Sequence, residues 1–260
     1  MSETAIRLSV FLGVLLSFAA LETLFPARQR ALPRARRWVT NLSLSALGSV
    51  VGALMAPVLA VSVAALAAQR GWGLFNVTDW NPWVEGVLAV VLLDFAIWVQ
   101  HVASHRVPLL WRLHSVHHTD RDLDVTSGVR FHPVEIGLSL LWKALVILAL
   151  GPAVVAVLVF EIVLNATALF THSNLRLPRR VDSVLRSLVV TPAMHRIHHS
   201  VVETETNSNY GFNLSVWDRL FRTYRARADG QLTLGLREHQ TDRPARLLPS
   251  LALPFMRRHR

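Results

Sequence analysis

The stretch HVASHRVPLLWRLHSVHH, residues 101–118, decides how this chain can fold. It holds two motifs of closely spaced histidines, HxxxH over residues 101–105 and HxxHH over residues 114–118. On an α-helix, residues three and four positions apart share one face, so each motif can direct its imidazoles at one point. Imidazole is the commonest metal ligand in proteins. The stretch therefore predicts helices that present histidines to a metal ion.

A second HxxHH motif occupies residues 195–199, and a single histidine at residue 172 follows an apolar run. In each HxxHH motif the last two histidines are adjacent, so they can face two different metal positions. Together the motifs supply nine histidines: His101, His105, His114, His117, His118, His172, His195, His198 and His199. A first-row metal ion takes about four to six ligands, so nine imidazoles predict a site for two ions. Imidazole ligands suit iron, zinc, copper and nickel and do not choose among them.

The remaining three histidines belong to no spaced motif. Whether His132 is a ligand stays open at this point. We expect His239 and His259 to lie on the surface or in the C-terminal tail.

The composition indicates a membrane protein rather than a soluble one. Of the 260 residues, 52% are hydrophobic and 17% are charged, against about 25% charged residues in average soluble chains. The net charge is +10 and Lys143 is the only lysine, but the arginines flank apolar runs instead of forming one stripe, which argues against nucleic-acid binding. The absence of cysteine excludes disulfides, thiolate-bound zinc and haem, and any iron–sulfur cluster within this chain.

A membrane-spanning helix needs roughly 20 apolar residues. The apolar runs that we expect to be membrane segments cover residues 8–25, 42–68, 83–99, 134–150 and 152–170. The run 42–68 contains no charge, which makes it the strongest candidate span. Gly151 and Pro152 break the last two runs into a hairpin. We expect the first run to be a retained helix rather than a signal peptide, because arginines follow it directly.

The distribution of arginine predicts the orientation. Residues 26–41 hold five arginines and residues 69–82 hold one, so the positive-inside rule places the first loop in the cytoplasm. All histidines then lie on the cytoplasmic side. The predicted fold class is an all-α integral membrane protein with about four to five transmembrane or hairpin helices and a cytoplasmic, histidine-rich helical cap that holds a di-metal site. Arginine in place of almost all lysine suggests a bacterial inner membrane as its location.

Charged residues inside or near the apolar runs are also candidates for a role. Lys143 and Glu161 lie at similar depth on either side of the hairpin turn, which predicts a structural ion pair, with a role in a substrate path as the alternative. A site made only of imidazoles needs carboxylates to orient the rings. Asp94 lies two helical turns before His101 and is the first candidate for this, with Asp120, Asp122, Asp124 and Asp218 as others.

The motifs resemble those of the fatty acid hydroxylase / sterol desaturase superfamily of integral-membrane di-iron oxygenases. The resemblance covers roughly residues 85–225 and extends beyond the histidines. The matching stretches are Asp94–His101, Leu110–His114, Arg130–Glu135, Thr191–His195, Asn209–Gly211, Trp217–Phe221 and Thr223–Tyr224. The resemblance implies that the nine histidines bind two iron ions, that Asp94, Asp218 and Asn209 lie around them, and that O2 is the co-substrate. Members of the superfamily hydroxylate, desaturate or cleave lipids, and the motifs do not distinguish these outcomes.

The resemblance also implies a division of the chain and a partner. We expect membrane spans and a basic loop in residues 1–84, a catalytic region in residues 85–225, and a basic interfacial tail in residues 226–260. Electrons must come from a separate ferredoxin, cytochrome or reductase, because the chain has no cysteine and no nucleotide-binding fingerprint. The basic residues that would attract such a donor, or else lipid headgroups, are Arg176, Arg179, Arg180, Arg222, Arg225 and Arg227.

Two other classes of function compete with this hypothesis. A zinc-dependent membrane hydrolase would use a glutamate beside the ligands, as in HExxH, and residues 101–105 have none. A metal transporter or a non-catalytic metal-binding protein would spread its ligands across the membrane, whereas these are expected on one side.

Overall fold

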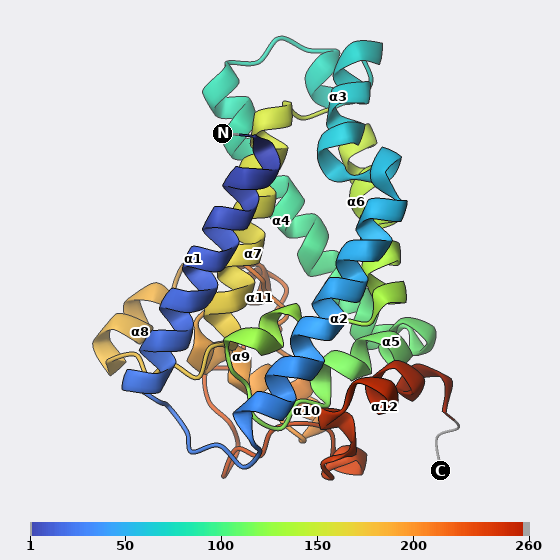
Figure 1. The fold of residues 1–260 in the computed structure, drawn as a ribbon. Coiled ribbons are helices and arrows are strands. Elements are labelled where there is room, and N and C mark those ends of the chain that lie inside the picture. The colour runs from blue at the N-terminus through green and yellow to red at the C-terminus, as the bar shows by residue number, and fades with distance from the viewer. Residues whose placement is uncertain (1, 257–260) are drawn as a thin grey trace.

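The structure, a computed structural model, describes residues 2–256 and consists of a bundle of long helices above a body of shorter ones (Figure 1). The α-helices are α1 (Glu3–Leu24), α2 (Arg34–Leu54), α3 (Ala60–Arg70), α4 (Pro82–Arg106), α5 (Pro108–His118), α6 (Pro133–Leu150), α7 (Val154–His172), α8 (Arg179–Leu185), α9 (Pro192–His198), α10 (Glu203–Thr206), α11 (Val216–Leu220) and α12 (Leu247–Ala252). Six short 3-10 helices lie between them, and within residues 2–256 β-structure is limited to three isolated bridges. The predicted all-α fold class is confirmed.

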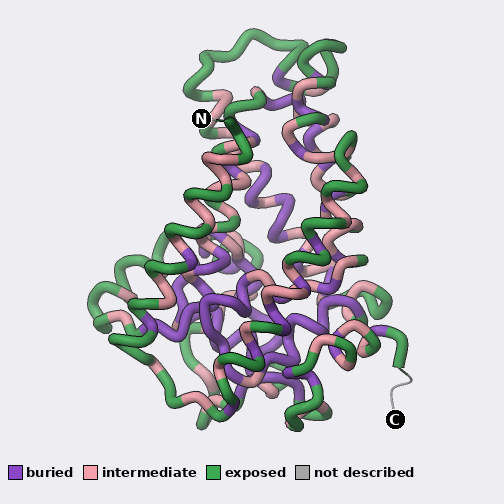
Figure 2. The backbone as a smooth tube through the Cα atoms, viewed as in Figure 1, coloured by how far each residue is buried: buried purple, intermediate pink, exposed green. Residues whose placement is uncertain are grey.

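Within the described residues, four helices are long and apolar enough to cross a membrane: α1, α4, α6 and α7. Their outward surfaces carry exposed apolar side chains, among them Leu16, Leu145 and Val155, each more than 60% exposed. Figure 2 shows this contrast, with exposed residues along the long helices and buried residues concentrated in the lower body. Apolar surface of this extent is unfavourable in water, and a helix satisfies its own backbone in lipid. The chain is therefore a membrane protein, as predicted.

The prediction of a continuous span over residues 42–68 is wrong. The run divides into α2, which begins at Arg34, a short 3-10 turn at Ala56–Val58, and α3. Pro57 explains the break, because proline lacks the N–H that a helix needs and clashes with the carbonyl four residues earlier. Neither piece is long and apolar enough to be a candidate span.

The predicted hairpin is formed by α6 and α7. Pro133 occupies the first turn of α6, and the ring of His132 accepts the hydrogen bond of the Val134 N–H. α6 ends at Gly151, which adopts a left-handed φ of 63° that glycine tolerates. A Cβ on Gly151 would also lie 2.3 Å from the Trp72 carbonyl oxygen, so only glycine fits where this turn meets the α3–α4 connection.

Apolar packing and one ion pair hold the bundle together. The largest cluster of buried side chains joins α3, α4, α6 and α7 and includes Leu93, Ile147 and Phe160. Lys143 Nζ lies 2.6 Å from Glu161 Oε1, which confirms the predicted ion pair, and Arg7 also reaches Glu161 at 2.8 Å. A charge in a bilayer is costly unless it is paired, so this contact fixes α1, α6 and α7 against one another.

The lower body, called the cap below, comprises residues 107–132 and 173–256. Buried charges join it to the membrane helices. Arg37 of α2 is 1% exposed and lies 2.7 Å from Asp120 and 2.6 Å from Asp124. Glu22 of α1 is fully buried and accepts hydrogen bonds from the backbone N–H groups of Val125 and Asn174. Removing one partner of such a buried pair is strongly destabilising, so these contacts stabilise the packing of the cap against α1 and α2.

Candidate metal centre

The nine predicted histidines converge at the junction of the long helices with the cap, in two groups. The five-histidine group contains His101, His105, His114, His118 and His198, and the four-histidine group contains His117, His172, His195 and His199. Within each group one ligand atom per residue lies within 4.8 Å of the others. Eight of the nine histidines are buried, and His105 is partly exposed.

Helix geometry explains how the motifs divide between the groups. The i, i+4 pairs stay together: His101 with His105 on α4, His114 with His118 on α5, and His195 with His199 at the end of α9. The remaining member of each HxxHH motif, His117 or His198, enters the opposite group. Adjacent residues on a helix are rotated by about 100°, so neighbours must point at different positions. Adjacent histidines therefore enter different groups, and the expectation that these groups are two metal positions stays a prediction.

In the five-histidine group, backbone carbonyls and one carboxylate orient the rings. His101 Nδ1–H donates to the Tyr210 carbonyl at 2.7 Å, and His198 Nδ1–H donates to the Ser208 carbonyl at 2.7 Å. His114 Nδ1 lies 2.6 Å from Glu135 Oε1. Because a carbonyl can only accept, Nδ1 carries the proton in His101 and His198, and their Nε2 atoms are bare.

The four-histidine group is built in the same way. His172 Nδ1–H donates to the Ala168 carbonyl at 2.7 Å, and His117 Nδ1–H donates to the Arg130 carbonyl at 3.2 Å. Their Nε2 atoms lie 3.0 Å apart, and His195 Nε2 lies 2.9 Å from that of His172. The ring of Phe131 stacks on His117 at 4.6 Å and covers this side of the group.

These contacts fit a metal ion better than they fit hydrogen bonds. His101 Nε2 lies 3.1 Å from the Nε2 atoms of both His114 and His198. Bare nitrogens repel each other at this distance unless a cation lies between them. Two nitrogens that are each about 2.1 Å from one ion, at an angle of about 90°, are separated by about 3 Å. Both ring nitrogens of His118 are buried without a hydrogen-bond partner, which leaves this ring available as a ligand.

The electrostatics favour neutral imidazoles in the cap. Burial, followed by repulsion from neighbouring imidazoles, lowers the pKa of His118 and His199 well below the usual value. Burial in the same cluster lowers the pKa of His198 to about 3. Only the neutral ring binds a metal, so these residues are held in the ligating form at neutral pH.

Glu135 is the carboxylate that orients a histidine ring, and sequence reasoning did not select it. It was visible only as part of the stretch Arg130–Glu135. Asp94 does not take this role: its oxygens accept from the Asn213 and Leu214 N–H groups and from Trp217 Nε1, so it fixes the loop before α11. On α4 it lies too far from the ring of His101, because seven residues of helix span about 10 Å.

Asp218 and Asn209 act on the histidines through the backbone. Asp218 accepts hydrogen bonds from the N–H groups of Tyr210 and Gly211, both at 2.8 Å, and so holds the peptide whose carbonyl orients His101. Asn209, with a φ of 52°, donates to the Met194 carbonyl in α9, next to His195. Asp218 also accepts from Trp98 Nε1 at 3.1 Å, but neither side chain is hydrogen-bonded to one of the nine histidine rings.

The other candidates lie elsewhere. Asp120 and Asp124 pair with Arg37, and Asp122 accepts from the N–H groups of Ala31 and Leu32, so none of the three orients an imidazole. His132 Nε2 lies 3.3 Å from the Leu251 carbonyl, away from both groups. His239 lies in a 3-10 helix of the cap, and His259 is outside the described residues.

Two openings border the five-histidine group. A cavity of about 280 Å³ between α2, α4, α6 and α7 reaches His101, His114 and Glu135 from the membrane side. A cleft of about 510 Å³ in the cap reaches His105 and Trp111. Trp111 packs its ring 4.9 Å from that of His105.

Comparisons with known proteins agree with this centre. A family model described as fatty acid hydroxylase matches residues 86–223. The chain is 31% identical over 166 residues to the ornithine lipid hydroxylase OlsE of Rhizobium tropici, an alignment that covers 64% of this chain and 49% of that protein. It is 26% identical over 160 residues to the alkylglycerol monooxygenase of Homo sapiens, covering 60% of this chain and 34% of the relative.

The chain thus spans about half or less of the length of these relatives. No solved structure is significantly similar to it.

Proposed function

Because the chain belongs to the fatty acid hydroxylase family, we propose that it is a membrane-bound di-iron oxygenase that hydroxylates or desaturates a C–H bond of a lipid. For hydroxylation, the substrate R–H and O2 take up two electrons and two protons and yield R–OH and water. The names of the relatives support a lipid substrate, since one is an ornithine lipid hydroxylase and another an alkylglycerol monooxygenase.

One observation carries the proposal: nine histidines form two adjacent groups in which bare Nε2 atoms converge at about 3 Å. The five-histidine group would hold one iron ion and the four-histidine group the other. Iron bound there supplies the activation of O2 and the oxidation of the C–H bond.

The protein's own residues supply position and a dry environment. The carbonyls of Tyr210, Ala168 and Ser208 hold the Nδ1 protons of three ligands, which fixes their tautomer and ring orientation. Phe131 and the buried cap exclude water from one side. The cavity between α4 and α6 brings a lipid segment to His101 and His114.

We also propose that the centre lies on the cytoplasmic side of a bacterial inner membrane, with residues 85–225 as the catalytic region and the C-terminus in the cytoplasm. A separate electron donor would dock on the cap, where Arg176, Arg179 and Arg227 are exposed. Acidic carriers are attracted by such a surface.

The proposal is tested by metal analysis of the purified full-length protein together with lipid profiles of cells with and without the gene, grown with and without O2. We expect two irons per chain and a hydroxylated or desaturated lipid that requires both the gene and O2. One zinc per chain, or a lipid product that forms equally without O2, would contradict the proposal.

Two histidine variants sharpen this experiment. His117→Ala should abolish the product and lower the iron content, because His117 belongs to the four-histidine group. His239→Ala is the matched control from outside both groups and should leave iron content and product unchanged.

A further inference from the structure

We propose that Gln100 and Ser139 bind an oxygen acceptor of the substrate inside the membrane cavity, so that the oxidised carbon lies beside a polar group rather than within a saturated hydrocarbon chain. The inference rests on the proposed function and names its substrate class: a lipid whose carbonyl, ester, amide or hydroxyl oxygen enters the site together with the reacting carbon.

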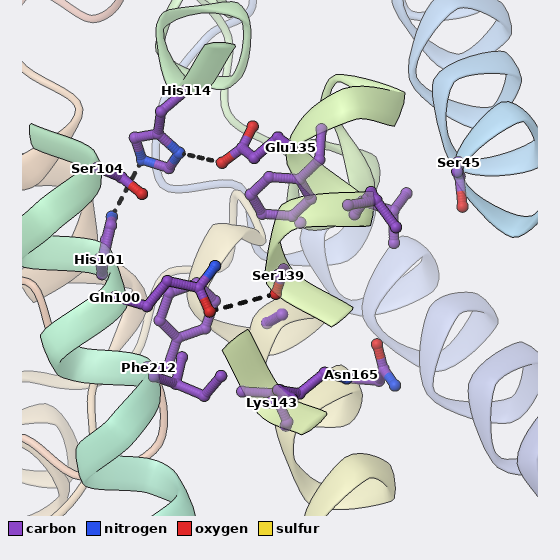
Figure 3. Close-up of a pocket in the computed structure, with 18 of the residues that line it drawn as sticks. Ser45, Gln100, His101, Ser104, His114, Glu135, Ser139, Lys143, Asn165 and Phe212 are labelled. Atoms are coloured by element: carbon purple, nitrogen blue, oxygen red, sulfur yellow. Dashed lines mark hydrogen bonds and ion pairs between the residues drawn. The ribbon is translucent and has the colours of Figure 1, made fainter. Parts of the chain in front are cut away.

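Two of the membrane helices around the cavity, α4 and α6, contribute polar side chains at helical spacing. α6 presents Glu135, Ser139 and Lys143, at i, i+4 and i+8, along one face. α4 presents Gln100 and Ser104 in the same way. Figure 3 shows Glu135 beside His114, with Gln100, Ser139 and Lys143 farther from His114 along the same space.

A cavity for a plain acyl chain would need none of these groups. Ligand pockets are mostly apolar and place a few polar groups where they fix the orientation of the ligand. Polar side chains within membrane helices are costly, and they face a cavity or hydrogen-bond across helices. At about 280 Å³ the cavity holds only a segment of a lipid, and its polar lining selects which segment.

Gln100 has donors that the protein does not use. The Ser139 hydroxyl donates to Gln100 Oε1 at 3.3 Å, and this bond connects α6 to α4. Within residues 2–256 the Gln100 Nε2 group makes no further hydrogen bond, and the residue is only partly buried, against the cavity. Its free N–H groups require an acceptor, and Gln100 is the neighbour of His101 in the chain. Gln100 and His101 both line the cavity, so an oxygen bound at Gln100 shares that cavity with the five-histidine group.

Exposed polar side chains also line the cavity, and they can hydrogen-bond the same oxygen-bearing group of a lipid. Ser49 of α2 and Asn165 of α7 line it and are exposed. At the far end from the histidines, Lys143 is already paired with Glu161. The route from lipid to His101 therefore offers hydrogen bonds at several points between apolar side chains such as Leu164 and Phe212.

Binding of two probes of equal chain length tests the inference without turnover. Deuterated hexadecanamide and hexadecane are equilibrated with the purified, metal-containing protein in detergent, and retained probe is measured by mass spectrometry against micelles alone. We expect hexadecanamide to bind about tenfold more tightly. Gln100→Met keeps the side-chain length and should reduce this preference about fivefold to tenfold, the value of one or two buried hydrogen bonds.

Gln69→Met on the exposed end of α3 is the matched control and should keep the full preference. If Gln100→Met lowers the yield of folded protein, Ser139→Ala provides the same test with a smaller loss. Equal binding of the two probes to the wild type, or a preference unchanged in both cavity variants, would overturn the inference. A wild type that prefers hexadecanamide but oxidises no lipid would contradict the proposed function and leave this inference standing.

Discussion

The five-histidine group and the four-histidine group differ in what surrounds them more than in what they contain. His101 and His114 of the five-histidine group line the membrane cavity, and His105 lines the cleft in the cap. No member of the four-histidine group lines either opening. The five-histidine group also has the carboxylate partner, Glu135. We therefore expect substrate to meet the metal of the five-histidine group, while the other metal is held in a closed environment.

Loss of a ligand should affect the two groups unequally, and this is the largest effect that we predict. His172→Ala leaves three ligands in the four-histidine group, whereas His105→Ala leaves four in the other. His172→Ala should therefore reduce the metal content from two ions per chain to one, and His105→Ala should retain both. Metal analysis of both purified variants measures this, and equal loss from both would contradict the comparison.

Local patterns predicted which histidines come together, because helical spacing is a local property. The i, i+4 pairs on α4, α5 and α9 could be read from the sequence, as could the break at Gly151. The absence of charge over residues 42–68 predicts one continuous span, but Pro57 ends the helix whatever the hydropathy of its neighbours.

The surroundings of the ligands could not be predicted in the same way. Four of the nine rings are oriented by backbone carbonyls, such as those of Tyr210 and Ala168, which no residue type reveals. Asp94 meets a loop about 120 positions later in the chain, a contact that only the fold creates. Glu135 lies at the start of α6, and its contact with His114 depends on how α5 packs against α6.

Glu135→Gln should weaken metal binding at the five-histidine group alone. The carboxylate fixes the orientation of the His114 ring through Nδ1, and the loss of such a partner typically costs about 10–100-fold in metal affinity. Competition with a chelator measures the release of the two metals separately. We expect one metal to leave earlier than in the wild type and the other to be unchanged. Accelerated release of both metals would show that the two groups are not independent.

The stability of the metal-free protein should depend on pH through the imidazoles of both groups. Burial lowers the pKa of His118, His195 and His199, so the folded state excludes protons that the unfolded chain binds below about pH 6.5. The stabilising contribution is fully present above that pH and is lost as the pH falls, by about 1.4 kcal/mol per pH unit for each imidazole.

Thermal unfolding of chelator-treated protein between pH 8 and pH 5 measures this slope. His118→Gln and His195→Gln remove one titrating ring from each group, and each should reduce the slope by about one proton. A slope that neither variant changes would show that the rings of the cap are not buried as described.

Asp218→Asn should have the smallest effect of these changes. It tests whether the Asp218 carboxylate positions a histidine of the five-histidine group through the backbone that it holds. Asparagine keeps one oxygen for the Tyr210 N–H but loses the acceptor for the Gly211 N–H, so the peptide that orients His101 shifts without being released. We expect less than a tenfold loss of metal affinity at the five-histidine group, since the direct partners of ligands account for about 10–100-fold.

Asp94→Asn is the matched control for this change, because Asp94 is similarly buried but holds the loop at Asn213 and Leu214 instead of the Tyr210 peptide. Both variants should lower the unfolding temperature, and only Asp218→Asn should speed metal release from the five-histidine group. If the two variants release metal at the same rate, Asp218 stabilises the cap without positioning His101. If only Asp218→Asn releases metal faster, the hydrogen-bonded path from Asp218 through Tyr210 to His101 sets the ring position, and the same reasoning extends to Asn209 and α9 in the four-histidine group.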